Sequence, residues 1–392
     1  MKISPCRLYG KLQLTSVFRG VLKTPVVAAF MRYASAPSEE KPYLYGEFVS
    51  RVYAVGGNLT QAVKSAVFED ENPYIKGIAK KQEALAEIKN SALRELSAFS
   101  LLASLTPADF AEEMGIEEGE IPHFASESVH LEGEYTSRSK SIEKYGYGMF
   151  ASHGMFRVSD DKKIEPVVSQ DKVRLDSFVG YGEERAKVIE NTRAFLAGKP
   201  AANALLYGDA GTGKSSTVKA VANAFFEEGL RLIEIRKDQL KLLPTVMAQI
   251  ADNPLKFIVF IDDLSFRKEG DDFSMLKAAL EGSASATADN AVIYATSNRR
   301  HIVRESFSDR DGDDVHRNDS LQESLSLSER FGLVVSFLKP NKTLYLSIVK
   351  ELATRYGVEM PVQELEVQAE AFALRKGNRS ARCAQQFILS LL

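Results

Sequence analysis

The sequence predicts an α/β fold with a five-stranded parallel sheet, a mainly helical region before it and a small helical lid after it. Beyond Pro166, short β-branched and apolar runs alternate with helical stretches, the pattern of parallel strands joined by helices. Beyond Pro340, three helical stretches follow without a further strand, and these predict the lid. Between Tyr43 and Leu102, apolar residues recur every three or four positions, which is typical of packed helices. The expected strands are residues 203–207, 231–235, 257–261, 292–296 and 333–337.

The composition is that of a globular chain that forms a core. Of its 392 residues, 44% are hydrophobic and 26% are charged. The formal net charge of -3 gives no overall attraction to nucleic acid. Arg19 and Lys23 interrupt the apolar candidate near the N-terminus, so no run reaches the roughly 20 residues that cross a bilayer. The two cysteines, Cys6 and Cys383, are too few for a disulfide framework and lack the spacing of zinc ligands.

Residues 1–38 have the composition of a mitochondrial presequence. They contain six Lys or Arg residues and no acidic residue, interleaved with apolar and hydroxyl side chains. Arg32 stands two residues before Ala34, which resembles a matrix-peptidase site whose cleavage leaves Ala34 at the new terminus. We therefore expect a mitochondrial protein of the matrix. A disordered basic tail is the alternative interpretation.

Residues 208–215 match the P-loop pattern. They follow an expected strand and open an expected helix, which is the context that the motif requires. Glycines let the backbone curl so that its N–H groups face phosphates, and the helix N-terminus adds a positive dipole. Lys214 is then expected to reach the β- and γ-phosphates of ATP, and to face solvent when no nucleotide is bound. The predicted nucleotide-contacting residues of this segment are Gly208, Asp209, Ala210, Gly211, Thr212, Gly213, Lys214, Ser215 and Ser216.

Two residues are expected to hold Mg²⁺. Ser215 supplies a hydroxyl, and Asp262 follows the apolar strand at 257–261, so both offer the oxygen ligands that Mg²⁺ prefers. Adjacent carboxylates after a buried strand are costly without a cation, and Asp262 is expected to hold the Mg²⁺ shell through water. Asp263 stands where a base orients the attacking water. The alternative is that both carboxylates cap a following helix.

A polar residue that ends the fourth strand is expected to face the γ-phosphate. Asn298 is favoured and Thr296 is the alternative, while a simple turn-forming role is the other interpretation. The strand at 231–235 lies between the P-loop strand and the acidic strand, and nucleoside kinases of the simplest P-loop order usually lack it. This spacing favours ATP hydrolysis over phosphoryl transfer to a small acceptor.

Five segments together resemble the P-loop ATPase family catalogued as domain of unknown function 815. They are residues 173–181, 205–208, 260–266, 294–301 and 326–333, within a similarity that runs from about residue 166 to residue 392. The resemblance implies an AAA+ module with ATP in the crevice between the α/β domain and the lid. It also implies that Val179 and Gly180 line the adenine side and that Asn298 is the first sensor.

The same resemblance assigns roles to three arginines. Arg330, just before the fifth strand, resembles an arginine finger that reaches the site of a neighbouring subunit, which implies a homo-oligomer as a ring or partial ring. A local pair between Arg330 and Glu329 is the alternative. Arg379 and Arg382 both lie where a second sensor is expected, and spacing alone does not separate them.

Two departures from the AAA+ pattern bear on activity. Most AAA+ ATPases place Glu after the metal-binding Asp, whereas this chain has Asp263, which points to slow hydrolysis. Threading unfoldases carry an aromatic-apolar-Gly loop after the second strand, but residues 236–240 at this place lack that pattern. The sequence therefore does not favour peptide threading. The predicted organisation is residues 1–38 for targeting, 39–165 for the helical region with a connector, 166–338 for the ATP-binding domain and 339–392 for the lid.

The function predicted from the sequence is that of a Mg²⁺-dependent AAA+ ATPase. Its catalytic residues are Asp263, Arg330 and Asn298, and it couples ATP binding and hydrolysis to the remodelling or regulation of a protein client. One alternative is a noncatalytic ATP-dependent scaffold or switch. The other is a nucleic-acid remodeller of the initiator or helicase-loader type, which the sequence leaves without an identifiable DNA-binding domain.

Overall fold

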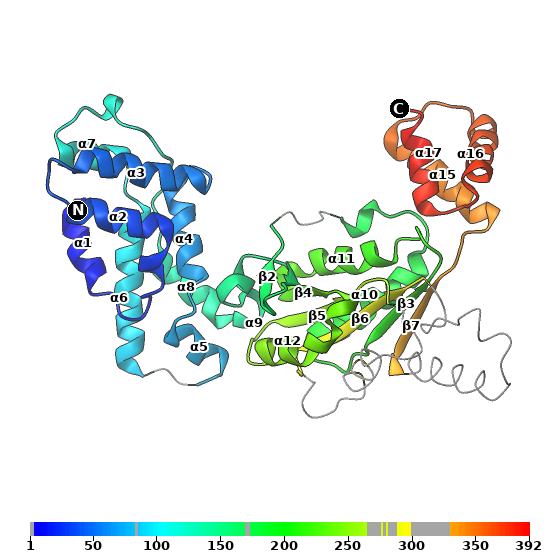
Figure 1. Ribbon diagram of the computed structural model, residues 1–392, viewed down its shortest axis with the longest axis horizontal. Helices are drawn as coiled ribbons and strands as arrows, with labels where there is room; N and C mark the ends of the chain where they lie inside the picture. The colour runs from blue at the N-terminus through cyan, green and yellow to red at the C-terminus, as the bar shows by residue number, and fades with distance from the viewer. Residues whose placement is uncertain are drawn as a thin grey trace. The chain divides into compact units, whose positions relative to one another are not determined.

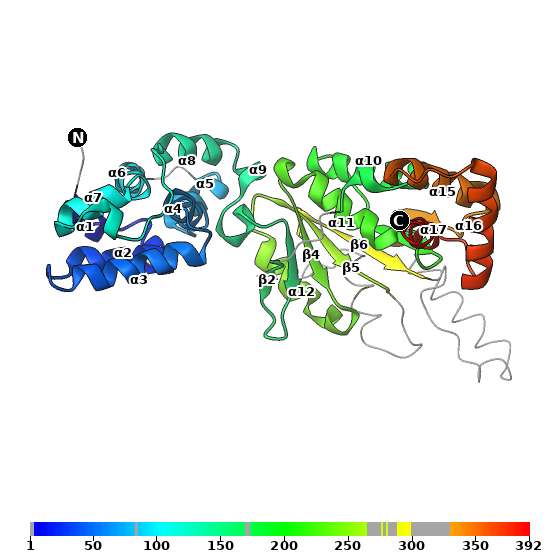
Figure 2. The ribbon, with the colours of Figure 1, turned by 90° about the horizontal axis from the view of Figure 1, so that it is seen from above.

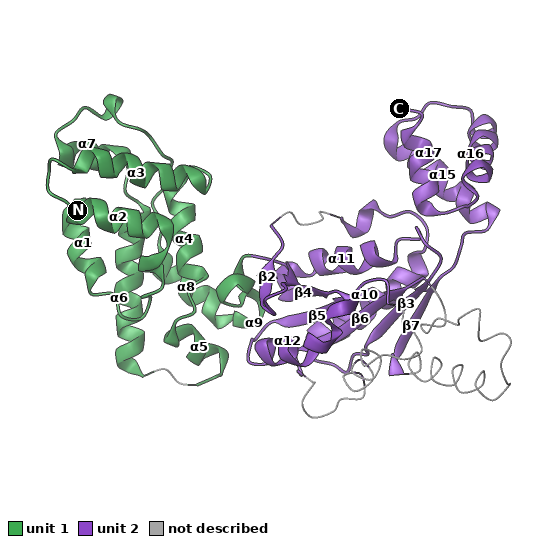
Figure 3. Cartoon of the chain, in the orientation of Figure 1, with its two compact units in different colours: residues 1–152 green, residues 153–392 purple. Residues whose placement is uncertain are grey.

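The computed structural model describes residues 4–82, 85–168, 173–264, 276, 280, 288–298 and 330–392. The chain divides into two compact units, Met1–Ser152 and His153–Leu392, which are coloured separately in Figure 3. The predicted boundary at residues 165/166 falls later than this division. The reason is that residues 155–158 and 164–165, which were assigned to the helical region with its connector, belong to strands of the second unit's sheet.

The first unit is helical, as Figure 1 shows in blue to cyan. Short side chains start several of its helices: the Asn58 side chain accepts a hydrogen bond from Gln61 N–H (3.0 Å), and the Asn72 side chain accepts one from Ile75 N–H (2.9 Å). The helices are α1 (Pro5–Gln13), α2 (Pro25–Ser35), α3 (Lys41–Ala54), α4 (Leu59–Phe68), α5 (Pro73–Ala79), α6 (Ala86–Ala103), α7 (Pro107–Met114), α8 (Leu131–Lys140) and α9 (Ile142–Tyr145).

The predicted targeting segment forms part of this unit's core. Leu8 and Leu12 of α1 and Phe30 and Tyr33 of α2 are fully buried, and the Phe30 ring packs edge-on against Phe48 of α3 at a centroid distance of 6.0 Å. Residues 4–38 and the helices after them therefore share one hydrophobic cluster. The described part of the segment does not have the character of a disordered basic tail, because its apolar faces are packed.

A buried carboxylate joins the segment between α1 and α2 to helix α6. Glu95 of α6 accepts hydrogen bonds from the backbone N–H groups of Ser16 (2.7 Å), Val17 (3.0 Å) and Phe18 (2.8 Å), and from the Ser16 hydroxyl (2.8 Å). Glu95 is only 7% exposed, so these donors replace the water that its charge would otherwise need. The contact fixes the early helices onto the remainder of the unit.

The second unit is built on a seven-stranded sheet with the order β2-β1-β4-β5-β6-β3-β7. The five predicted strands are all present, and they are parallel to their neighbours. The prediction missed β1, which pairs in parallel with β4, and β2, which pairs with β1 antiparallel. The strands are β1 (Met155–Val158), β2 (Ile164–Pro166), β3 (Ala204–Gly208), β4 (Leu230–Ile235), β5 (Lys256–Ile261), β6 (Ala291–Ser297) and β7 (Leu333–Phe337).

Helices cover the sheet and continue into the lid, as Figures 1 and 2 show. Helices α10 (Gly182–Leu196) and α11 (Lys214–Ala224) pack on each other and against strands, and α12 (Leu243–Ile250) follows β4. The lid comprises α15 (Lys342–Tyr356), α16 (Val362–Lys376) and α17 (Ala381–Leu389), which pack together around buried Tyr345, Ala369 and Phe387. None of the helices in the described residues has the length and apolar character needed to cross a membrane.

Candidate nucleotide-binding site

The P-loop, residues 208–215, connects the end of β3 to the start of α11. Gly208, Gly211 and Gly213 have φ angles of 137°, 79° and 92°, which side chains other than hydrogen rarely permit. At Gly208 a Cβ atom would lie 2.1 Å from the carbonyl oxygen of Phe337, so glycine is required there by space as well as by conformation. The loop thus has the curled backbone that the motif predicts.

Lys214 is folded into the site. It is 6% exposed, and its Nζ donates hydrogen bonds to the carbonyl oxygens of Gly208 (2.9 Å) and Asp209 (2.8 Å) and to Asn298 Oδ1 (3.0 Å). The expectation that Lys214 faces solvent in the absence of nucleotide is therefore wrong. Burial lowers the pKa of Lys214, and the nearby carboxylates of Asp209, Asp262 and Asp263 offset only part of that effect.

Asp262, at the end of β5, gathers the hydroxyl groups of two neighbouring elements. Ser215 Oγ donates to Asp262 Oδ1 at 2.6 Å, and Thr296 Oγ1 donates to the same oxygen at 2.5 Å. The backbone N–H of Asp263 lies within hydrogen-bond distance of both Asp262 Oδ1 (3.1 Å) and Thr296 Oγ1 (3.0 Å). The two residues predicted to hold Mg²⁺, Ser215 and Asp262, are thus brought into direct contact.

Asp263 has a left-handed backbone, with φ of 51°, which aspartate tolerates better than most residues. Its Oδ1 accepts a hydrogen bond from Asn298 Nδ2 at 2.8 Å. Because the oxygen of the same amide accepts from Lys214, Asn298 bridges the cation of the P-loop and the carboxylate predicted as a base. Thr296, the alternative to Asn298, donates to the Asp262 carboxylate and accepts from the Asp263 backbone N–H.

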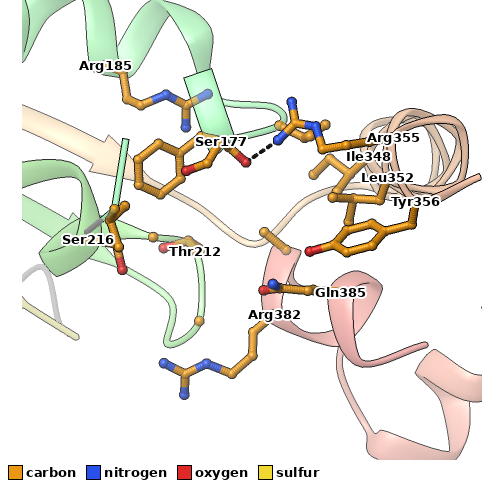
Figure 4. A pocket seen from close by; sticks show the side chains of 16 residues that line it. Ser177, Arg185, Thr212, Ser216, Ile348, Leu352, Arg355, Tyr356, Arg382 and Gln385 are labelled. Atoms are coloured by element: carbon orange, nitrogen blue, oxygen red, sulfur yellow. Dashed lines mark hydrogen bonds between the residues drawn. The ribbon is translucent and has the colours of Figure 1, made fainter. Parts of the chain in front are cut away.

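Two adjoining cavities surround these side chains. The first has a volume of about 280 Å³ and is lined by most of the predicted phosphate residues and by the two predicted metal residues, Ser215 and Asp262. The second has a volume of about 340 Å³ and lies between the α/β domain and the lid (Figure 4). Gly211, Gly213, Ser216 and Arg382 line both cavities. Of the other predicted phosphate residues, Thr212 lines the second cavity, and Gly208 and Asp209 line neither. The smaller cavity is lined by polar and charged side chains, and the larger one also has aromatic and aliphatic walls.

The lid contacts the P-loop directly through the start of α17. The backbone N–H of Arg382 donates to the carbonyl oxygen of Gly211 at 3.2 Å. Arg379, the alternative sensor, is held by Glu370 instead, through a bidentate pair with distances of 2.9 Å and 2.8 Å. Of the two arginines that spacing did not separate, Arg382 is therefore the one that lines the site.

The segment before α10 forms another wall of the larger cavity. Val179, which was predicted for the adenine side, lines that cavity, whereas Gly180 is not one of its lining residues. The carbonyl oxygen of Gly180 accepts a hydrogen bond from Arg185. The Arg185 guanidinium also lies over the Phe178 ring, 5.0 Å from its centroid. Gly180, with φ of 71°, packs against Ile348 of the lid.

Sequence reasoning missed several side chains in this cavity. Arg355 of α15 donates to the carbonyl oxygen of Ser177, a contact that joins the lid to the segment before α10 (Figure 4). Figure 4 also shows Tyr356 and Gln385 on the lid side, facing Thr212 of the P-loop. These residues belong to no motif. Only the predicted crevice between the lid and the α/β domain pointed to their helices.

Arg330 and the P-loop of the same chain lie at opposite ends of two neighbouring strands, β7 and β3. It precedes the amino end of β7, whereas the P-loop follows the carboxyl end of the parallel strand β3, and Ala204 pairs with Leu333 while Gly208 pairs with Phe337. A strand of this length spans roughly 15 Å. Arg330 is not among the residues that line either cavity. Residues 299–301 and 326–329, which belong to the predicted motifs, lie outside the described residues.

The donor set at the polar end suits Mg²⁺ with phosphate oxygens. Ser215 and Asp262 provide hard oxygen atoms at adjacent positions, and Lys214 provides a cation beside them. Across the described ranges, no group of three or more His, Cys, Asp or Glu residues forms an independent metal cage. This arrangement fits a cation whose remaining ligands come from a phosphate group and water.

Comparison with solved structures finds similarity to RuvB from Thermotoga maritima. One RuvB variant shares 16% identity over 55% of this chain and 64% of that chain, with a TM-score of 0.38. A structure of the Thermotoga maritima RuvB Holliday junction branch migration motor shares 15% identity over 56% of this chain and 70% of that chain, with a TM-score of 0.33. The chain thus spans about 64% of the length of the first of these proteins. No curated protein matches the sequence.

The fold and a family match together establish what kind of chain this is. The P-loop strand β3 lies between β6 and β7, the acidic strand β5 lies beyond β6, and a helical lid follows the sheet, which is the AAA+ arrangement. Residues 151–392 match the family described as "Protein of unknown function (DUF815)", and this match covers more than half of the sequence. The chain therefore belongs to the DUF815 family, and its second unit has an AAA+ fold.

Proposed function

We propose that this protein is a Mg²⁺-dependent AAA+ ATPase that uses ATP binding and hydrolysis to remodel or regulate a protein partner. The observation that carries the proposal is the continuous polar network at the carboxyl edge of the sheet. In that network the Asn298 amide is hydrogen-bonded to both Lys214 and Asp263. Beside it, the Asp262 carboxylate accepts hydrogen bonds from Ser215 and Thr296. A purely structural loop has no need for a buried lysine next to three carboxylates.

The residues of the polar cavity fit the phosphates and the metal. Lys214 is already desolvated and is held by weak acceptors, two carbonyls and an amide, which phosphate oxygens can replace. Ser215 and Asp262 would hold Mg²⁺, which supplies charge neutralisation to the phosphates when bound. The larger cavity would take the adenosine between Val179 on one side and the lid residues Ile348 and Tyr356 on the other.

Asp263 and Asn298 would control the attacking water. Asp263 is the carboxylate nearest to Asn298, and the amide holds it in one orientation at 2.8 Å. On the loss of the Lys214 contact, the Asn298 amide is free to turn toward a phosphate, and the carboxylate is then free to accept a proton from water. This exchange of partners makes Asp263 a base that works only when the site is filled.

The position of Arg330 supports an assembly in which one copy completes the site of another. Its place before β7 separates it from the P-loop of its own chain by the length of the strand. A guanidinium there can stabilise transition-state charge only in a neighbouring copy. We therefore include a homo-oligomer, as a ring or partial ring, in the proposal. A mitochondrial matrix location also remains a proposal, and it rests on the composition of residues 1–38.

A noncatalytic switch is the rival function, and one observation favours it. Asp263 is one methylene shorter than the glutamate usual at this position, and its carboxylate is already hydrogen-bonded to Asn298. If Asp263 stays bound to Asn298, ATP binding can still act as a switch, but the carboxylate does not activate water for hydrolysis. The two functions therefore differ in turnover, while they share ATP binding and the contact between lid and P-loop.

Steady-state hydrolysis of Mg-ATP by the full chain separates the two functions. We expect turnover by the wild type that increases with protein concentration, and a loss of about 10³-fold in Arg330→Ala with ATP binding retained. Asp263→Asn should also bind ATP without turnover, and Asp238→Asn, which changes an exposed carboxylate outside both cavities, is its matched control.

Mixing the two inactive variants adds a sharper test of the shared site. Some interfaces in the mixture pair an intact Asp263 with an intact Arg330, so part of the activity should return. If the wild type binds ATP and assembles but shows no hydrolysis above background, the enzyme proposal fails and the switch proposal stands.

A further inference from the structure

Three side chains from separate helices meet in the first unit. Cys6 lies on α1, Lys41 on α3 and Glu113 on α7. Lys41 Nζ lies 2.9 Å from Cys6 Sγ and also donates to Glu113 Oε1, while Cys6 Sγ lies 3.3 Å from that same oxygen. The thiol, the amine and the carboxylate are thus in mutual contact, and none of them has a role in the proposed ATPase.

The backbone fixes the thiol in this arrangement. The N–H of Cys6 donates to Glu113 Oε2 at 2.9 Å, and Cys6 Sγ also lies 3.5 Å from the carbonyl oxygen of Ala34. On the amine side, Lys41 Nζ lies 5.4 Å from the centre of the Tyr33 ring. The nitrogen and the sulfur are therefore held close together by contacts from two further helices, α2 and α7.

Accessibility differs sharply within the cluster. The side chains of Lys41 and Glu113 are only 7% and 10% exposed, whereas Cys6 is an exposed residue. A small oxidant from solution can reach the sulfur, while the lysine nitrogen is largely shielded from bulk water. An oxidised sulfur at Cys6 would have the nitrogen of Lys41 within 2.9 Å and the weaker nucleophile Glu113 Oε1 within 3.3 Å.

Glu113 gives the amine a local proton acceptor. Burial alone would raise the pKa of Glu113, but its hydrogen bonds with Lys41 and Cys6 lower it overall. Conversely, burial alone would lower the pKa of Lys41, and its contacts with Cys6 and Glu113 raise it overall. The resting cluster is thus an ion pair beside a sulfur atom, and moving one proton from Lys41 to Glu113 produces a free amine in contact with that sulfur.

We propose that Cys6 and Lys41 are a site of oxidative crosslinking, in which hydrogen peroxide converts their contact into a covalent S–N bond. In the first step the Cys6 sulfur attacks the peroxide, an S–O bond forms, the O–O bond breaks, and water leaves, which yields a sulfenic acid. In the second step Lys41 passes a proton to Glu113, its nitrogen attacks the sulfur, and the S–O bond breaks. The hydroxyl group leaves as water with the proton returned by Glu113, and the bonded nitrogen releases its remaining extra proton to solvent.

The reaction balances with one peroxide for each crosslink. Counted from the neutral amine, the thiol and the amine each lose one hydrogen atom, the sulfur is oxidised by two electrons, and the peroxide is reduced to two molecules of water; the ammonium form of Lys41 releases one further proton to solvent. Sulfenic acids condense in the same way with backbone nitrogen to give sulfenamides. An added dithiol reverses the change, because it attacks the sulfur, releases the Lys41 amine and becomes a disulfide itself.

The crosslink would join α1 to α3 and close a loop that contains all of α2. Closing such a loop restricts the unfolded chain, so the first unit gains stability. The effect also depends on retention of residues 4–33. A chain cut before Ala34 would lack Cys6 and could not form the bond.

The test is peptide mass mapping of the purified full chain after treatment with hydrogen peroxide. We expect a peptide pair that joins Cys6 to Lys41 with the loss of two hydrogen atoms, and its disappearance after dithiothreitol. Cys383→Ser, which removes the other cysteine, should crosslink like the wild type, whereas Cys6→Ser and Lys41→Arg should not. The oxidised wild type should also show a rise of roughly 5 °C or more in the Tm of the first unit.

Two results would overturn the proposal. One is a fully folded wild type in which peroxide converts Cys6 to sulfinic or sulfonic acid, or to a disulfide between two chains, with no Lys41 linkage. The other is a Cys6 crosslink with the same loss of two hydrogen atoms in Lys41→Arg, which would assign the bond to a different nitrogen. Because Lys41 is buried, Lys41→Met serves as a second variant, and circular dichroism checks that both are folded.

Discussion

The backbone N–H of Arg382 donates a hydrogen bond to the carbonyl oxygen of Gly211, and the distance between the two atoms is 3.2 Å. This contact places the first turn of α17 against the tip of the P-loop, with the Arg382 side chain lining both cavities. The lid is thus part of the candidate site in the conformation that the structure describes.

Replacement of Arg382 should therefore weaken ATP binding. We expect Arg382→Ala to raise the Kd by about 10- to 100-fold, since a hydrogen bond to a charged group contributes about 1.5–3 kcal/mol. Arg379→Ala is the matched control, because its guanidinium pairs with Glu370 and should change the Kd by less than about twofold. Calorimetric titration with Mg-ATP measures both. Equal effects of the two variants would show that the assignment of Arg382 is wrong.

Removal of the P-loop lysine should abolish most of the affinity for ATP. Lys214→Ala is expected to raise the Kd at least about 100-fold, because it removes the buried cation at the phosphate end. Lys219 lies on the same helix and pairs with Glu234. The Lys219→Ala variant should therefore keep the wild-type affinity for ATP. Isothermal titration calorimetry compares the two variants, and unchanged binding by Lys214→Ala would contradict the site itself.

The Glu95 contact should govern the stability of the segment between α1 and α2. Glu95→Ala leaves three backbone N–H groups without their acceptor, and we expect a loss of about 3 kcal/mol or more. Hydrogen exchange at Val17 and Phe18 should then be faster by about 100-fold. Arg94→Ala, at the neighbouring position of α6, is the control. Unchanged protection at Val17 and Phe18 would mean that other contacts hold this segment.

The Glu113 carboxylate should make the first unit less stable in acid. Its pKa is lowered in the folded state, so the stability that it contributes is fully present above the unfolded pKa, near 4.5, and is lost as the pH falls through the folded value. Glu113→Gln should cost about 3 kcal/mol at pH 7, because Lys41 then has no anionic partner. The difference in stability between the variant and the wild type should disappear in acid. A difference that stays constant from pH 7 to below the folded pKa would contradict this account.

Residues 1–33 should carry a reporter protein into mitochondria if their basic composition acts as a targeting signal. The import of a fusion protein and the N-terminal sequence of the native chain measure this directly. Cleavage before Ala34 would remove Leu8, Leu12 and Phe30 from the core, so a cleaved chain should expose hydrophobic surface and bind a dye such as ANS. A reporter that remains in the cytosol, or a native chain that still begins with Met1, would rule out the targeting prediction.

The sequence was most informative where local pattern determines structure. The P-loop, the five predicted strands and the acidic pair at 262–263 each have a characteristic residue pattern along the chain. The structure contains these strands and brings the P-loop and the acidic pair together at one end of them. The strands β1 and β2 were missed because they are short and are joined by charged residues from Asp160 to Lys163. Pairing with β4, which is distant along the chain, is what makes β1 a strand.

The helices of residues 4–35 illustrate a different limit. Basic residues interleaved with apolar ones are typical of a presequence, but the same periodicity describes an amphipathic helix that packs in a domain. What distinguishes the second case is a partner such as Glu95, which is more than 70 residues away from Ser16, Val17 and Phe18. Likewise, the burial of Lys214 depends on Asn298, which follows the end of strand β6 and is 84 residues away in sequence. Neither relationship has a local signal.

Asp209 connects the P-loop to the chain that enters the lid. Its backbone N–H donates to the carbonyl oxygen of Phe337 at 3.1 Å, and its Oδ2 accepts from the N–H of Lys339 at 2.6 Å. If bound nucleotide changes the relative free energies of two lid positions through Asp209, then these two lid positions must differ in their nucleotide affinity. The two free-energy differences are equal in size. A partner that pulls on α15 would therefore expel nucleotide by the same factor by which nucleotide weakens that partner's hold.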